Sequence, residues 1–140
     1  MPSSDQHTKQ ATHNEGLLSL LQQQARHIEY GDWFVTVAFY AALHRIEAML
    51  YTKKYVVRGS AVRHSSDARK IWGSLSDHGA RELLMKQVFS ALYDPYVTLY
   101  EMSQIAKYSC HLHSEFDWSR AVSLLELIKK MCDLVCGKSG

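Results

Sequence analysis

Residues 33–51, WFVTVAFYAALHRIEAMLY, constrain the fold most, because nearly every position is apolar or small. On a 3.6-residue repeat these side chains cover most of the helix circumference and are not confined to one stripe. The remaining charges, Arg45 and Glu47, stand close together toward one end. Such a helix has to be buried, so the pattern predicts the central helix of a bundle.

Apolar periodicity and capping residues predict further helices on both sides of this segment. The expected helices cover residues 14–30, 33–53, 66–75, 78–92, 96–109 and 118–136, with an interruption or kink at Pro95. The longest expected loop is 54–63, whose β-rich start has no sequence partner. The sequence therefore predicts an all-α fold, an up-and-down four-helix bundle with one short extra helix.

The first thirteen residues contain no large apolar side chain after Met1. We therefore expect residues 1–13 to form a flexible leader outside the core and residues 14–137 to form a single helical domain. The longest apolar run is too short to span a bilayer, and the N-terminus lacks the pattern of a signal peptide. These features predict a cytoplasmic protein with no membrane attachment.

The charge and cysteine counts exclude few functions. A net charge of +2 implies nucleic-acid binding only if positive charge is concentrated on one face. Cys110, Cys132 and Cys136 are an odd number and lack zinc-finger spacing, so we expect reduced thiols, no structural disulfides and no cofactor.

Three segments in order resemble the HEPN superfamily of small helical-bundle proteins, found in toxin–antitoxin systems and RNA-processing machines. They are AFYAALHRIEAMLY at 38–51, RHSSDARKIW at 63–72 and LYEMSQIAKY at 99–108. The resemblance implies a helical bundle that forms a homodimer. In many active members, an Arg and a His separated by four to six residues meet their symmetry copies in a dimer cleft and cleave RNA without metal.

Two segments are similar to that Arg-to-His motif. Arg58 and His64 have five residues between them, and Lys107 and His113 have the same spacing with lysine in place of arginine. A histidine would move the proton during RNA cleavage, while a nearby cation stabilises phosphate charge. We therefore assign the candidate catalytic residues as His64, Arg58 and His113, and the candidate phosphate-binding residues as Arg69, Lys107 and Tyr108.

Plainer interpretations apply to the same residues. The Arg58–Arg69 region can be a solvated basic loop with His64 as a helix entry residue. His111 and His113, near Glu115 and Asp117, suggest a metal, but their spacing is unlike a zinc site and we expect none. Within the buried helix, His44 and Glu47 lie three residues apart and can share a polar pocket.

The predicted function is binding of RNA or nucleotide phosphate by a HEPN-like homodimer, with a candidate metal-independent endoribonuclease activity of the toxin–antitoxin type. The alternative is a non-catalytic protein-interaction or antitoxin-like scaffold module that binds a cognate protein through exposed aromatic residues. The sequence leaves open whether the protein is an enzyme.

Overall fold

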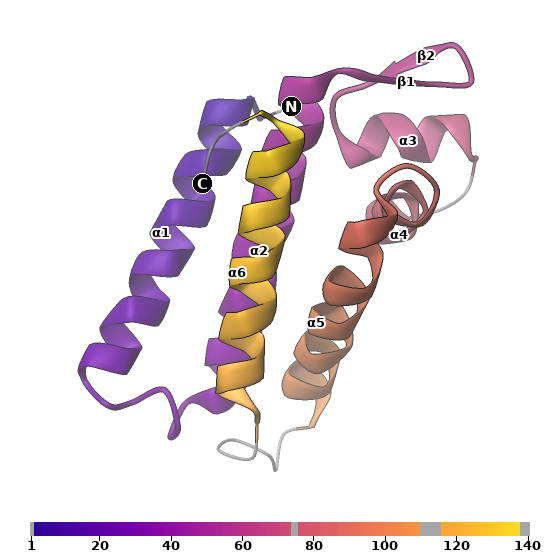
Figure 1. Ribbon diagram of the computed structural model, residues 1–140. Coiled ribbons are helices and arrows are strands. Elements are labelled where there is room, and N and C mark those ends of the chain that lie inside the picture. Colours follow the sequence, from indigo (N-terminus) through magenta and orange to yellow (C-terminus); the bar gives the residue numbers. More distant parts are fainter. Residues whose placement is uncertain (1, 74–75, 110–115, 138–140) are drawn as a thin grey trace.

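The computed structural model describes residues 2–73, 76–109 and 116–137. Within these ranges the fold is predominantly helical, in agreement with the predicted class, and one small antiparallel sheet interrupts it (Figure 1). The elements are α1 (Ser4–Gln23), α2 (Gly31–Lys53), β1 (Tyr55–Val57), β2 (Ser60–Val62), α3 (Ser65–Ile71), α4 (Asp77–Gln87), α5 (Ser90–Tyr108) and α6 (Trp118–Val135).

Helix α2 is the central element, as predicted, and packs against α1, α5 and α6 (Figure 1). Its fully buried side chains include Phe34, Ile46 and Leu50. Burial is not uniform around the helix, because Trp33 is 64% exposed and Tyr40 is 37% exposed. One face of α2 near its start therefore remains in contact with solvent.

The N-terminal segment differs from the predicted flexible leader at 1–13, because α1 begins at Ser4 and continues to Gln23. Ser3 caps it with a capping box, in which its hydroxyl accepts from the Gln6 amide and the Gln6 side chain accepts from the Ser3 amide. His7 and Ala11 are buried against the rest of the fold. The residues that make this contact are a histidine and an alanine. The sequence of the segment therefore shows no stripe of large apolar residues, and this part of the helix was not predicted.

The predicted loop at 54–63 contains a β-hairpin, which corrects the expectation of an unpaired β-rich fragment. Strand β1 pairs with β2 in antiparallel register, with Tyr55 opposite Val62 and Val57 opposite Ser60. The two-residue turn, Arg58 and Gly59, has positive φ at both positions, 50° and 79°. This is the backbone of a tight hairpin turn, in which glycine adopts positive φ without steric cost.

Helix α1 ends at Gln23 and not at the predicted residue 30, and Ala25 just beyond it has a φ of 54°. The other boundaries lie within a few residues of the predicted ones, except at Pro95. This proline lies inside α5, and the chain breaks earlier, at Val88 and Phe89 between α4 and α5. The Phe89 ring packs edge-on against Tyr55, with 4.5 Å between centroids, and so fixes the break against the hairpin. Pro95 removes one backbone donor without ending the helix. Asp117 caps α6, as expected.

Among the helices in the described ranges, none combines the length and hydropathy needed to span a bilayer.

The docking of α1 is testable with two neighbouring residues. Ala11 is fully buried and Thr12 is exposed. We expect Ala11→Asp to lower the free energy of unfolding by about 3 kcal/mol or more, because it buries an unpaired carboxylate. Thr12→Asp introduces the same side chain at the neighbouring exposed position of α1 and should cost less than about 1 kcal/mol. Chemical denaturation measures the free energy of unfolding of both variants. If both effects are equally small, residues 1–13 are not packed against the core, and the prediction of a flexible leader would be correct.

Candidate functional site

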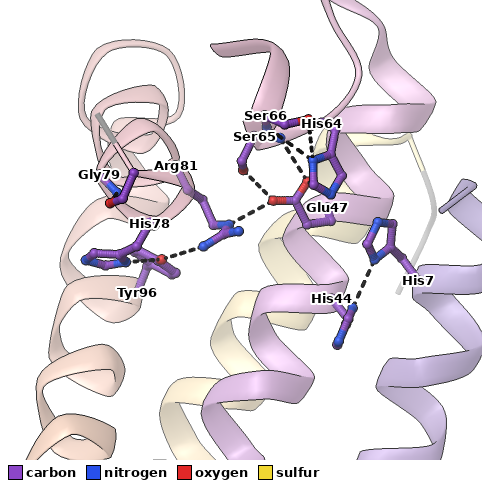
Figure 2. A network of polar contacts seen from close by, with 11 residues as sticks. His7, His44, Glu47, His64, Ser65, Ser66, His78, Gly79, Arg81 and Tyr96 are labelled. Carbon is purple, nitrogen blue, oxygen red and sulfur yellow. Dashed lines mark hydrogen bonds and ion pairs between the residues drawn. The ribbon is translucent and has the colours of Figure 1, made fainter. Parts of the chain in front are cut away.

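A connected set of polar side chains passes through the interior of the protein, with the carboxylate of Glu47 at its centre (Figure 2). Glu47 lies on α2 and is fully buried. Ser65, at the start of α3, donates its amide to Oε2 at 3.1 Å and its hydroxyl to Oε1. Arg81 on α4 donates from Nε to Oε1 at 2.8 Å. Three elements are therefore held together by one carboxylate.

The ion pair with Arg81 decides the charge of Glu47. Burial alone would raise the pKa of this carboxyl, but the guanidinium, His64 and the Ser65 hydroxyl together hold the pKa below its usual value. Burial would likewise lower the pKa of Arg81, and Glu47 raises it. Both groups are thus charged at neutral pH, and each supplies the compensation that the other needs inside the protein.

On the α4–α5 side, the contacts continue from Arg81 to the surface. Its Nη1 donates to the hydroxyl of the fully buried Tyr96 at 3.2 Å, and that hydroxyl lies 2.7 Å from His78 Nδ1. His78 stacks on Tyr100, with 3.6 Å between ring centroids, and its Nε2 lies 3.1 Å from Glu82. Every polar atom named along this branch has a partner, which is typical of a structural network.

His64 joins Glu47 to the start of α3. It is the N-cap residue of that helix, and its Nδ1 accepts the Ser66 amide at 3.1 Å. Its Nε2 lies 3.5 Å from Glu47 Oε2. The expected role of His64 as a helix entry residue is confirmed. The ring is only 16% exposed, so it faces the interior more than solvent.

Two further histidines extend the site toward α1. His7 Nδ1 lies 2.9 Å from His44 Nδ1, and the His7 ring stacks on His64 with 5.4 Å between centroids (Figure 2). Burial lowers the pKa of His7 to about 4 and also lowers the pKa of His44. Both rings are therefore neutral at pH 7. They also line an open pocket of about 460 Å³, whose other walls are Pro2, Gln6 and Gln10.

Glu47 and two of the histidines near it have the composition of a metal-binding set. One potential ligand atom from each of His7, Glu47 and His64 lies within 4.8 Å of the other two. His7 Nε2 is buried and has no hydrogen-bond partner in the part of the chain that the structure describes. His111, His113 and Glu115, which we considered as metal ligands in the sequence analysis without expecting a metal there, lie outside the described residues.

Positive charge gathers where α2 ends. Residues 53–70 carry six basic side chains and one acidic one, Asp67, which gives this segment a net charge of +5, while the whole chain has +2. All six are exposed, on the end of α2, the hairpin and α3, at one end of the molecule (Figure 1). We call this surface the basic end; it consists of Lys53, Lys54, Arg58, Arg63, Arg69 and Lys70.

The structure brings some of the sequence-predicted site residues together and separates others. Arg58, His64 and Arg69 all belong to the hairpin and α3, although Arg69 also pairs with Asp77 at 3.8 Å. Lys107 lies at the far end of α5, where Nζ donates to the Tyr40 hydroxyl at 2.8 Å (Figure 1). About 20 Å of helix separates Tyr40 from Lys53. Tyr108 is 80% exposed at that end. His113 lies outside the described residues.

Sequence reasoning missed His7, Ser65, Arg81 and Tyr96 as members of the central network. His7 lies in the segment that was expected to be flexible. Arg81 lies in the first turns of a predicted helix, where nothing in the sequence distinguishes it from an exposed arginine. The only signal was Glu47 itself, because a carboxylate in an otherwise buried helix requires a cation or several donors. The sequence does not indicate which element supplies them.

Comparisons with protein-family models, with curated proteins and with solved structures find no match to this chain.

The Glu47–Arg81 pair predicts a large mutational asymmetry. Arg81→Met should lower the free energy of unfolding by about 3–5 kcal/mol, because it leaves a buried carboxylate without its cation. Replacing both residues, as Glu47→Leu with Arg81→Met, should cost less than Arg81→Met alone. Arg26→Met, which removes the exposed pair with Glu29, should cost less than about 1 kcal/mol. Urea titration compares the variants, and equal losses for Arg81 and Arg26 would contradict the buried pair.

His7 predicts a pH dependence of stability. Its pKa falls from 6.5 unfolded to about 4 folded, so the unfolded state binds the proton first. The stability that this neutral ring contributes is present above pH 6.5 and is lost as the pH falls toward 4. In buffer with chelator, the free energy of unfolding of His7→Gln should decrease by on the order of 2 kcal/mol less than that of the wild type over this pH range. His13→Gln, on the exposed side of α1, should show the same decrease as the wild type. The measurement is the free energy of unfolding as a function of pH. If wild type and His7→Gln lose stability in parallel as the pH falls, His7 is not the group responsible.

Proposed function

We propose that this chain is a HEPN-like helical-bundle protein that binds single-stranded RNA through its basic end. The observation that carries the proposal is the concentration of positive charge there. Residues 53–70 carry six exposed cations and one acidic side chain in a chain of almost balanced charge, and Asp77 from α4 pairs with one of the cations, Arg69. Phosphate backbones bind such surfaces by releasing condensed counterions, and this term dominates the affinity for nucleic acid.

The shape of the basic end also suits a flexible strand. Its cations are divided among the end of α2, the hairpin and α3 with the segments that join them (Figure 1), so they form no single straight row. Arg63 lies over the Tyr51 ring at 5.8 Å. Single-stranded nucleic acids are held by such combinations of dispersed cations and aromatic rings.

The family resemblance supplies the rest of the proposal. The segments 38–51, 63–72 and 99–108 fall on α2, on the whole of α3 and on α5, and each of these helices contributes residues to the central network. We propose that α1, α2, α5 and α6 correspond to an up-and-down four-helix bundle, that the protein acts in the cytoplasm as a homodimer, and that its setting is of the toxin–antitoxin type.

Binding is better supported than cleavage. A ribonuclease needs a histidine that can exchange a proton at the phosphate. His64 is the histidine next to the basic cations, but its Nδ1 caps α3 and its Nε2 faces Glu47. Cleavage that persists with a chelator and is lost in His64→Asn, which preserves a capping side chain, would add metal-independent ribonuclease activity to the proposal.

A second candidate function, protein interaction without chemistry, is favoured by a different surface. Trp33 and Tyr40 on α2 and Ile105 and Tyr108 on α5 are exposed at the end opposite the hairpin. Lys107 lies 4.7 Å from the centre of the Tyr40 ring within this group. Exposed aromatic clusters of this kind are typical of protein interfaces.

RNA binding is tested by exchanging charge at the basic end. We expect Arg58→Asp with Lys70→Glu to weaken binding to a short single-stranded RNA at least tenfold at low salt. The slope of log affinity against log salt should fall by about 1.4, or about 0.7 for each lost phosphate contact. Asp suits position 58 because it tolerates positive φ. Fluorescence anisotropy measures both quantities.

The matched control reverses the same charge on exposed residues of α6, with Arg120→Glu and Lys130→Glu. We expect this variant to bind RNA within about twofold of the wild type once salt screens the change in net charge. If both variants lose the same RNA affinity, the effect comes from the net charge of the protein and not from the basic end. No saturable RNA binding, together with concentration-dependent self-association, would favour the interaction module.

A further inference from the structure

We propose that His7, Glu47 and His64 form a binding site for one transition-metal ion of the zinc class. The site goes beyond RNA binding at the basic end and does not depend on it. One ligand atom from each residue lies within 4.8 Å of the other two, and His64 Nε2 is 3.5 Å from Glu47 Oε2. Zinc with bonds of 2.0–2.1 Å places tetrahedral ligands roughly 3.4 Å apart. Small side-chain rotations therefore suffice to close the set.

The unpartnered nitrogen of His7 points to a ligand independently of these distances. His7 is only 4% exposed, and its Nε2 has no hydrogen-bond partner within the described residues. Its other nitrogen, Nδ1, lies 2.9 Å from His44 Nδ1. When His7 donates from Nδ1, Nε2 carries a buried lone pair, and a metal ion would satisfy it.

His44 then acts as the outer partner that orients a metal ligand. Histidines bound to metal usually donate their second N–H to an acceptor, which fixes the tautomer and the orientation of the ring. The short contact between His44 and His7 supplies that arrangement from the neighbouring helix (Figure 2).

His64 must change its tautomer to join the site. At present Nδ1 accepts the Ser66 amide, which places the proton on Nε2. Metal binding at Nε2 moves the proton to Nδ1, where the Ser66 hydroxyl, 3.0 Å away, can accept it. The cost is the loss of one side-chain helix cap. Zinc binding to structural sites releases far more free energy than one cap contributes, so the exchange favours the metal.

The ligand types select the class of ion. Two imidazoles and one carboxylate match zinc and neighbouring transition metals, whereas magnesium and calcium require mostly oxygen ligands. The Ser65 hydroxyl and Arg81 hold Glu47 Oε1, while Oε2 accepts the Ser65 amide and lies 3.5 Å from His64 Nε2. A carboxylate oxygen has two lone pairs, so Oε2 can accept the amide and still bind a metal ion. Three protein ligands leave one tetrahedral position for water or another ligand. His7 also lines the open pocket, which gives the site a route to solvent.

The experiment uses the full chain after chelator treatment and adds zinc or cobalt alone. We expect one equivalent of Zn²⁺ to bind, measured by competition with a chromophoric chelator, and Tm to rise with zinc concentration. Co²⁺ should give the visible absorption of a four- or five-coordinate ion. His7→Ala and His64→Asn should lower affinity more than a hundredfold, and His44→Ala by the 10- to 100-fold typical of an outer partner.

His13→Ala is the matched control, because His13 is an exposed histidine on the same helix as His7. It should bind zinc within about twofold of the wild type. Circular dichroism and Tm without metal establish that each variant is folded. The proposal is overturned if zinc fails to bind, or if folded His7→Ala binds it as the wild type does. A thiolate-to-cobalt band lost in Cys132→Ser with Cys136→Ser would also overturn it. RNA binding is measured separately, so either result leaves the other proposal standing.

Discussion

The buried carboxylate of Glu47 is the constraint on which the rest of the structure depends. A charge placed in the most apolar helix of the chain has to be compensated, and the compensation comes from two other elements. Arg81 draws α4 against α2, and Ser65 fixes the first turn of α3. The hairpin is held between them because it connects α2 to α3. The ion pair thus positions the end of the molecule that carries the exposed cations. Without a buried carboxylate at position 47, Arg81 and Ser65 would lose the group that holds α4 and α3 against α2.

The surface and the interior of this end differ in electrostatic character. The outer surface carries six cations in a short segment, while the interior beside it holds an ion pair and neutral histidines. A polyanion and a metal ion would therefore use different faces of the same corner. His64 is the residue that both could affect, because its backbone continues from the hairpin and its ring faces Glu47.

The sequence predicted the helical class and the central place of residues 33–53, because burial of an apolar helix follows directly from its composition. It also predicted His64 at the entry of a helix, since capping is a local effect. It did not predict the hairpin, whose strands are three residues long and whose turn contains an arginine at positive φ. The partners of Glu47 could not be predicted, because they come from elements 18 and 34 residues away. Their approach is decided by tertiary packing and not by any periodic pattern.

Helix α1 shows why composition alone misjudged the N-terminus. Its buried residues are His7, Ala11 and Leu18, which follow a helical spacing only if a histidine and an alanine count as core positions. A hydropathy pattern gives those positions no weight, so the first half of the helix resembles a polar leader. His44 and His64 give the buried His7 ring polar and aromatic neighbours. Contacts outside that network hold the same helix against α2, because Ser4 donates to the Ala48 carbonyl and Glu15 pairs with Arg45. Contacts between polar residues far apart in the sequence therefore order a weakly apolar segment, and those partners have to be known before the chain's first element can be placed.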